Sequence, residues 1–169
     1  MTFIIRHETS ADIRAIETLT AAAFMDAEHS SHTEQFIVNA LRRAGALFLS
    51  LVAEQDGQLI GHASISPVTV SDGTPGWYGL APVSVLPTHQ NQGIGSRLIR
   101  QLLAELPENG GAGCVVLGNP NYYGRFGFRA QAALTLPSIP AEYFQVLSFG
   151  GGKLPQGTVA FHPAFDATE

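Results

Sequence analysis

The sequence predicts an α+β domain built on a mixed, mostly antiparallel sheet, and three observations support this fold class. Apolar residues recur with helical spacing in two segments near the start, 13–24 and 36–41. Between residues 46 and 86 the spacing changes to two and is broken by tight-turn residues, as in an antiparallel meander. The strand over 77–86 is then followed by a helix and a second apolar strand. Two strands joined in this way are parallel, with a right-handed crossover.

Composition and charge restrict the class of protein. The chain has 169 residues, of which 45% are hydrophobic and 14% charged, so we expect a single domain over residues 1–169. It contains no apolar run of membrane-spanning length and no signal-peptide pattern. The single cysteine, Cys114, excludes an internal disulfide, and the net charge of −5 argues against nucleic acid as a partner. We therefore expect a cytoplasmic protein that binds neither nucleic acid nor membrane.

The N-terminal segment predicts a strand and then a helix. Residues 2–6 are a short strand candidate. Ser10 is placed to cap the helix over 13–24, with Asp12 in its first turn. The apolar face of this helix carries Ile13, Ile16, Leu19 and Phe24.

A second helix is predicted after a polar break. Ser31 and Glu34 match the S-x-x-E capping box that begins many helices. Gly45 is placed to end this helix. Its apolar face carries Phe36, Ile37, Ala40 and Leu41.

Three antiparallel strands are predicted next. The first spans residues 46–54, and Asp56-Gly57 is the preferred turn for a tight hairpin. The second spans residues 58–70. A polar, glycine-containing turn over 71–76 then connects it to the third, at 77–86.

The next segment predicts an anion site. Pro87 closes the preceding strand, and Pro107 is expected to stop the helix that follows. Gly93 and Gly95 lie in the loop 90–95 beside the first turn of that helix. A helix start offers unpaired N–H groups and the positive end of the helix dipole, and glycine lets a ligand approach them closely. The loop therefore predicts a cradle for phosphate or pyrophosphate. The apolar face of the helix carries Ile94, Leu98, Ile99, Leu102, Leu103 and Leu106.

An aromatic segment, 118–128, leaves the strand predicted at 114–117 and contains two tyrosines and two phenylalanines. Ligands of such sheets lie outside the carboxyl ends of the parallel strands, which is also where the 90–95 loop lies. A tyrosine placed there can donate a proton to a bound ligand. Two further strands are expected at 143–149 and 158–161, with a glycine-rich turn between them.

Together these features resemble the GNAT superfamily of acetyl-CoA-dependent N-acetyltransferases. Residues 90–95 match its Q-x-x-G-x-G pyrophosphate motif. Tyr123 lies four residues before Gly127, where the family usually carries its acid. The resemblance covers nearly the whole chain in element order, most specifically 83–128, and is similar to a bacterial branch of predicted acetyltransferases. It implies a three-layer fold with about four helices and a sheet splayed between its fourth and fifth strands.

The resemblance also implies a co-substrate, acetyl-CoA, and roles for individual residues. The amides of residues 92–97 would hold the pyrophosphate, and the backbone of Val83 and Val85 would bind the pantetheine arm. The Val85 N–H would stabilise the oxyanion, and Tyr123 would protonate the departing CoA thiolate. Asn119 and Arg125 would flank the thiol end or the adenine. The implied binding set is Val83, Val85, Gln90, Asn91, Gln92, Gly93, Ile94, Gly95, Ser96, Arg97, Asn119, Tyr123 and Arg125.

The sequence departs from the family pattern at the general base. Many members carry a glutamate on the fourth strand, whereas residues 77–86 contain no carboxylate. Candidates near the implied acceptor pocket are Glu34, Glu28, His32 and His29. For Glu34 we favour the interpretation that it caps its helix. His29 and His32 have the spacing of a metal pair but no third ligand, so we expect no metal.

Other candidate residues have simpler structural interpretations. We interpret Tyr122 and Cys114 as packing residues. His89 and Arg97 are equally compatible with phosphate contact and with solvation. Trp77, Phe24 and Phe36 are candidates for an acceptor pocket, but aromatic residues at these positions are more often core.

The predicted function is transfer of an acetyl group from acetyl-CoA to a small-molecule or peptide amine in a ternary complex, by a monomer or homodimer. One alternative is an acyltransferase that uses a longer acyl-CoA or an acyl carrier protein. Another is a CoA-binding sensor without turnover, which the missing carboxylate favours. A nucleotide-dependent oxidoreductase is disfavoured because the third glycine of its fingerprint is absent.

Overall fold

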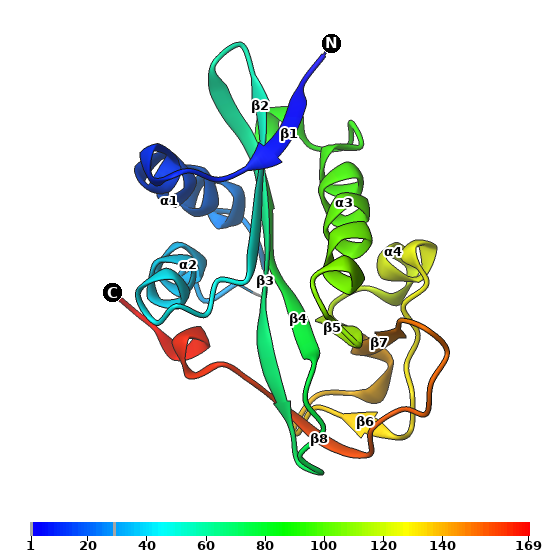
Figure 1. Cartoon of the computed structure of the whole chain (residues 1–169). Helices are drawn as coiled ribbons and strands as arrows, with labels where there is room; N and C mark the ends of the chain where they lie inside the picture. Colours follow the sequence, from blue (N-terminus) through cyan, green and yellow to red (C-terminus); the bar gives the residue numbers. More distant parts are fainter. Residues whose placement is uncertain (1, 29) are drawn as a thin grey trace.

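The computed structural model describes residues 2–28 and 30–169. Figure 1 shows a central sheet between two pairs of helices. Helices α1 (Ile13–Phe24) and α2 (Glu34–Arg43) cover one face. Helices α3 (Ile94–Glu108) and α4 (Pro120–Tyr123) lie on the other side. This is the three-layer arrangement predicted by the resemblance. No helix in the described part of the chain is both long and apolar enough to cross a bilayer.

The sheet has eight strands, and its main path runs β1-β2-β3-β4-β5-β7. Along this path β4 and β5 are parallel and the other neighbours are antiparallel, so the sheet is mixed as predicted. Strand β8 pairs with the far end of β3 and, in parallel, with β6. The strands are β1 (Ile4–His7), β2 (Leu49–Gln55), β3 (Gln58–Val70), β4 (Trp77–Val85), β5 (Gly113–Leu117), β6 (Leu134–Thr135), β7 (Phe144–Ser148) and β8 (Gly157–Phe161).

The sheet splits between β4 and β5. Residues Trp77 to Gly79 pair with Gly113 to Val115, and the pairing then stops. The rest of β4, residues 80–85, continues its pairing with β3 but not with β5. One edge of β4 is therefore left open, which confirms the predicted splay between the fourth and fifth strands.

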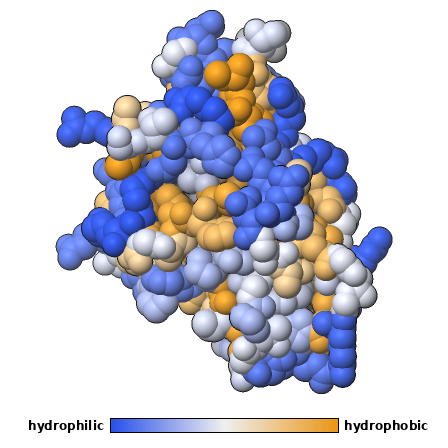
Figure 2. Space-filling view, in the orientation of Figure 1, coloured by the Kyte–Doolittle hydropathy of each residue, from blue (hydrophilic) through white to orange (hydrophobic). Residues whose placement is uncertain are grey.

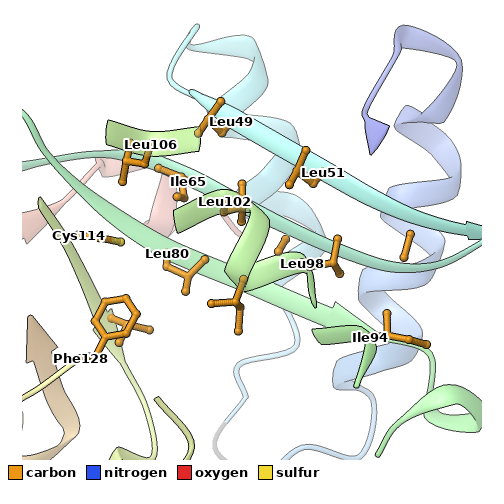
Figure 3. Close-up of a cluster of buried hydrophobic side chains, with 14 of the residues drawn as sticks. Leu49, Leu51, Ile65, Leu80, Ile94, Leu98, Leu102, Leu106, Cys114 and Phe128 are labelled. Carbon is orange, nitrogen blue, oxygen red and sulfur yellow. The ribbon is translucent and has the colours of Figure 1, made fainter. Parts of the chain in front are cut away.

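The face under α3 is an apolar core. Leu98, Leu102 and Leu106 of α3 are fully buried against β2, β3 and β4 (Figure 3). Phe128 extends the same cluster toward β5 and Cys114. Burying these side chains ties the start of α3 to the open edge of β4 and so fixes the position of the glycine loop.

The opposite face, under α1 and α2, is partly polar. His62 of β3 is fully buried, and its Nε2 lies 2.8 Å from the Ser50 hydroxyl. That hydroxyl also bonds Glu8, and Glu8 forms a salt bridge with Arg42 of α2 at 3.0 Å. Burial lowers the pKa of His62 to about 4, with Arg42 lowering it further and Glu8 opposing the shift. The imidazole is therefore neutral at neutral pH.

The predicted helix caps are wrong in detail. Thr9, rather than Ser10, precedes the first turn, because its N–H donates to the Asp12 carboxylate at 2.7 Å. Arg6 holds that carboxylate in place at 2.8 Å and keeps the pKa of Asp12 low, at about 2. At α2 the expected Ser31 box is absent, since the Glu34 carboxylate accepts from the Ser30 hydroxyl at 2.7 Å instead.

The helix ends differ from one another. Gly45 ends α2 as predicted: it has φ 69°, and the next N–H bonds back to the Leu41 carbonyl at 2.9 Å. Pro107 does not stop α3, because it lies inside the last turn and removes only its own N–H from the helix. The helix ends at Glu108, one residue after Pro107; Gly110 then adopts φ 93°, and the Gly111 N–H bonds to the Leu106 carbonyl.

Strand positions follow the predictions closely: β3 has its predicted bounds, and no end of another predicted strand is displaced by more than three residues. The Asp56-Gly57 turn is confirmed by φ values of 51° and 79°. Strand β7 pairs antiparallel with β5, whereas β8 crosses to the end of β3. Strand β6 was not predicted, because two residues carry no periodic pattern.

Candidate active site

A groove of about 590 Å³ lies beside the open edge of β4. The loop after β4, the first turn of α3 and the tyrosine segment after β5 form its other walls. Most of the predicted binding residues meet here. The lining residues are Val83, Val85, His89, Gln90, Asn91, Gly93, Ile94, Gly95, Ser96, Tyr122, Tyr123 and Arg125.

The backbone of Val83 and Val85 faces the open edge. The Leu86 N–H bonds to the Ile60 carbonyl at 2.9 Å, so these two residues form a hydrogen-bonded pair across β3 and β4. Hydrogen-bonded pairs alternate with non-bonded pairs in an antiparallel ladder. Val83 and Val85 therefore occupy the non-bonded positions, and their N–H and C=O groups point away from β3. The Gln90 side chain reaches the Val85 carbonyl from that open side, at 3.2 Å.

The start of α3 leaves several amides free of helical partners. Gly93 precedes the helix with φ 83°, and its carbonyl accepts the Arg97 N–H at 3.1 Å. The N–H groups of Ile94 and Ser96, and of Gly95 between them, come before that bond and so have no partner within the helix. A Cβ at Gly95 would lie 3.2 Å from the Tyr122 hydroxyl, so glycine keeps this approach open. The helix start thus presents amides and a positive dipole end to the groove.

Three predicted binding residues lie outside the groove. The Arg97 N–H is bonded to the Gly93 carbonyl, and the Arg97 guanidinium stacks 4.5 Å from the Phe3 ring centre. Arg97 does not line the groove, and its pyrophosphate contact stays a prediction. The Asn119 side chain caps α4 by accepting the Asn121 N–H at 2.9 Å. Gln92 is exposed and does not line the groove.

Tyr123 packs at the inner end of the groove. Its ring makes an edge contact with Phe128 at 6.0 Å between centres. A Cβ at Gly118 would lie 2.5 Å from the Tyr123 ring, so this glycine makes room for the tyrosine. Burial raises the pKa of Tyr123 to about 12, and the neighbouring Tyr122 adds to the shift. The phenol is therefore protonated at neutral pH and able to act as an acid.

A second cavity, of about 500 Å³, lies on the far side of Tyr123. Val83 and Tyr123 line both spaces. The second cavity is mainly apolar, with two carboxylates, Glu34 and Asp166, among its lining residues. Figure 2 shows apolar side chains gathered near the middle of this face of the molecule, where α2 approaches the sheet. The lining residues are Phe24, Glu34, Ile37, Leu80, Ala81, Pro82, Val83, Leu117, Tyr123, Leu136, Phe161, Phe165 and Asp166.

The structure separates the candidates for the general base. Glu34 lines the second cavity, whereas Glu28 and His32 do not. His29 lies outside the described residues. No group of three or more metal-ligating side chains occurs among residues 2–28 and 30–169.

Of the three aromatic residues considered for an acceptor pocket, one lines the second cavity. Phe24 lines the second cavity, whereas Phe36 does not and Trp77 is buried in the core beside Gly113. Tyr122 packs against the main core as predicted, but it also lines the groove. Asp166 was missed, because nothing in the C-terminal sequence indicates that it returns to α2.

Comparison with known proteins assigns this architecture to a family. The sequence model of the acetyltransferase (GNAT) family matches residues 13–128, more than half of the chain. This chain belongs to the GNAT acetyltransferase family. The predicted resemblance is therefore confirmed, and the enzyme class is that of the acyltransferases.

Several relatives of this GNAT chain are similar over most of its length. The uncharacterized N-acetyltransferase YhbS of Escherichia coli K12 is 38% identical over 130 residues, which cover 76% of this chain and 75% of YhbS. A GNAT acetyltransferase from Brucella melitensis, solved in complex with acetyl-CoA, is 50% identical with a TM-score of 0.87. That alignment covers 98% of this chain and 99% of the other. YhbS from Escherichia coli, solved in complex with CoA, has a TM-score of 0.86 at 33% identity, covering 99% and 93% of the two chains.

Proposed function

We propose that this protein transfers the acetyl group of acetyl-CoA to a primary amine by direct attack in a ternary complex. One observation carries the proposal: Tyr123 lines both the amide-bearing groove and a separate apolar cavity. A thioester in the groove and an amine in the cavity would meet at this side chain. The bound acetyl-CoA and CoA of the two similar structures support the choice of donor.

The groove fits the parts of acetyl-CoA in order. The amides at the start of α3 and the loop from Gln90 would hold the pyrophosphate, where Arg125 adds a positive group. The outward backbone groups of Val83 and Val85 would bond the pantetheine arm as an added strand does. Arg125 stacks on the Tyr122 ring at 4.7 Å, which holds its guanidinium at the groove wall.

The reaction then needs three catalytic groups: one that stabilises the oxyanion, one that protonates the thiolate and one that accepts a proton from the amine. The amine nitrogen attacks the thioester carbonyl, and the Val85 N–H would stabilise the negative oxygen that forms. As the carbon–sulfur bond breaks, Tyr123 would donate its proton to the leaving thiolate. The nitrogen must also lose a proton. Strand β4 carries no carboxylate, so Glu34 or Asp166, through water, would accept it.

The missing carboxylate on β4 also favours a second candidate function, a CoA-binding sensor without turnover. The two functions differ in one measurable property, since a sensor binds CoA but acetylates no amine. A longer acyl donor, a cytoplasmic location and a monomeric or dimeric state stay predictions.

The proposal is tested by isothermal titration of acetyl-CoA and CoA into wild type and Gly93→Val. A side chain at Gly93 has no neighbour within 4 Å and φ is 83°, so valine would both fill the groove and strain the loop. We expect binding to weaken by about 100-fold or more, since strain and clash together exceed about 2.7 kcal/mol. Gly57→Val is the matched control, because Gly57 has φ 79° and open space but lies at the β2–β3 hairpin.

Two outcomes would contradict the proposal. A folded wild type that binds neither ligand would exclude acetyl-CoA as the donor. Equal binding by Gly93→Val and Gly57→Val would exclude the glycine loop as its site. Tight binding with no acetylation across a panel of primary amines would favour the sensor.

A further inference from the structure

We infer that the acceptor is a primary amine with an apolar body and no acidic group beside the nitrogen, and that Asp166 determines this specificity. The inference rests on the proposed function, because it assigns the second cavity to the acceptor. It restricts the chemical class of the acceptor from the charges and side chains that line that cavity.

The cavity walls indicate an apolar body. Phe24 of α1, Ile37 of α2 and Phe161 of β8 lie on its walls together with Leu136 and Phe165. A volume of about 500 Å³ is within the usual range for small-ligand sites. An aromatic or branched aliphatic group would displace water from these walls, whereas a sugar would leave hydroxyl groups unpaired there.

The charges of the lining indicate a cation. Glu34 and Asp166 line the cavity, and no lysine, arginine or histidine of the described residues does. An ammonium group would be attracted to these carboxylates. A carboxylate on the acceptor, as in a free amino acid, would face like charge with no cation to bind it. A free alkyl amine and a peptide amino terminus share the favoured chemistry, because neither has a carboxylate beside the nitrogen.

The carboxylates of Glu34 and Asp166 differ in whether other side chains of the protein already bind them. Both oxygens of Glu34 lie within 2.9 Å of the Ser30 hydroxyl, so this side chain is held at the start of α2. Asp166 is exposed, and no basic side chain in the described part of the chain forms a salt bridge with it. The turn that carries Asp166 is fixed against α2, since Phe165 packs on the Ile37 cluster. Asp166 is thus positioned by packing but keeps its carboxylate for a ligand.

The test compares matched acceptors at saturating acetyl-CoA. Phenethylamine, L-phenylalaninamide and L-phenylalanine share one aromatic body, and isopentylamine, L-leucinamide and L-leucine share one aliphatic body. We expect kcat/KM for the amines and amides to exceed that for the amino acids by at least about tenfold. The reason is that the carboxylate of a bound amino acid would have no cationic partner in the cavity. Preference for the amides over the simple amines would indicate a peptide acceptor, and the reverse a small molecule.

Asp166→Asn tests the assigned residue. We expect KM for phenethylamine to rise about tenfold, the loss of one charge-assisted hydrogen bond, and the discrimination against L-phenylalanine to shrink. Asp26→Asn is the control, since Asp26 is also exposed and acidic but does not line the cavity. The thermal midpoint and the acetyl-CoA affinity should be the same in both variants.

The outcomes distinguish the inference from the proposed function. Amino acids acetylated as well as their amines, or an Asp166→Asn variant with unchanged discrimination, would each overturn the inference. Acetylation of other primary amines but of none of the six compounds would also overturn it. Acetyl-CoA binding with no acetylation of any amine would overturn the proposed function and favour the sensor. Loss of acetyl-CoA binding by wild type would instead overturn the proposed function.

Discussion

The two cavities that meet at Tyr123 are built in opposite ways. The groove is formed largely by one continuous stretch, residues 83–96, together with the nearby tyrosine segment, and it includes the start of α3 with its unpaired amides. The second cavity is formed by side chains from α1, α2, β4 and β8 and from the turn that contains Asp166. Figure 1 shows that the C-terminal segment returns to α2, so the early helices and the C-terminal turn lie side by side.

The cavities also carry opposite charge. Arg125 lines the groove, and no aspartate or glutamate of the described residues does. Glu34 and Asp166 line the second cavity without a basic residue from the described part of the chain. Under the proposed function, an anionic donor and a cationic acceptor would therefore be attracted to different cavities before they meet at Tyr123. Backbone amides are present whatever the side chains are, so they suit a ligand that related proteins share. Side chains from separate segments can differ between related proteins whose acceptors differ.

The largest expected effect is at Tyr123, one of the two residues that line both cavities. Tyr123→Phe should lower kcat about 100-fold, the low end of what a general acid supplies, and leave acetyl-CoA affinity nearly unchanged. Because the pKa of Tyr123 is raised to about 12, the phenol stays protonated at neutral and mildly alkaline pH. Steady-state rates should therefore show no loss of kcat from this group as pH rises from about 7 to about 10. A wild-type kcat that falls near the ordinary tyrosine pKa would contradict this role.

The next prediction concerns how the free energy of unfolding depends on pH through His62. Helices α1 and α2 lie on the sheet face that contains His62, whose pKa burial lowers to about 4. The unfolded imidazole binds a proton at a higher pH than the folded one. The stability contributed by the neutral imidazole is therefore present above about pH 6.5 and is lost as pH falls toward 4. Urea unfolding should show a loss of about 2 kcal/mol between about pH 7 and 5.

His62→Gln provides the control for this pH dependence. Its amide can still bond the Ser50 hydroxyl but does not titrate, so most of the loss between neutral and mildly acidic pH should disappear. An unchanged slope in this variant would assign the acid sensitivity to other groups.

A smaller effect is expected where a glycine admits the tyrosine. Gly118→Ala would place a Cβ 2.5 Å from the Tyr123 ring, so the ring must move. We expect kcat to fall about tenfold, as small misplacements of a catalytic group do, with donor affinity within about twofold of wild type. Gly124→Ala is matched to it, since a Cβ at Gly124 would meet nothing within 4 Å, and should behave as wild type. Equal kcat in the two variants would contradict a positional requirement at Tyr123.

The smallest effect is expected at a groove side chain. Ser96 lines the groove, but its amide rather than its hydroxyl belongs to the helix start. Ser96→Ala should change the acetyl-CoA dissociation constant by less than about threefold, within one weak hydrogen bond. Titration calorimetry that shows a larger loss would mean that side chains, and not only backbone, define the donor groove.

Local signals predicted the backbone around the groove and several turns well. Gly93 and Gly95 indicated the helix start, and Gly45 and Asp56-Gly57 indicated a helix end and a hairpin that the structure confirms. The capping box at Ser31 and the stop at Pro107 were wrong, because neighbouring residues supplied other partners or continued the helix. Local patterns state which conformations are favourable, and tertiary contacts then select among them.

The sequence by itself determined the element order, the parallel β4–β5 pair and the glycine-bearing start of α3, because each depends on residues close together in the chain. Only the tertiary structure decided that Arg97 turns to Phe3, that Tyr123 joins two cavities and that Asp166 comes to lie beside α2. These contacts join segments that are far apart in the sequence. Packing of the whole chain determines them, and no local period or spacing encodes them.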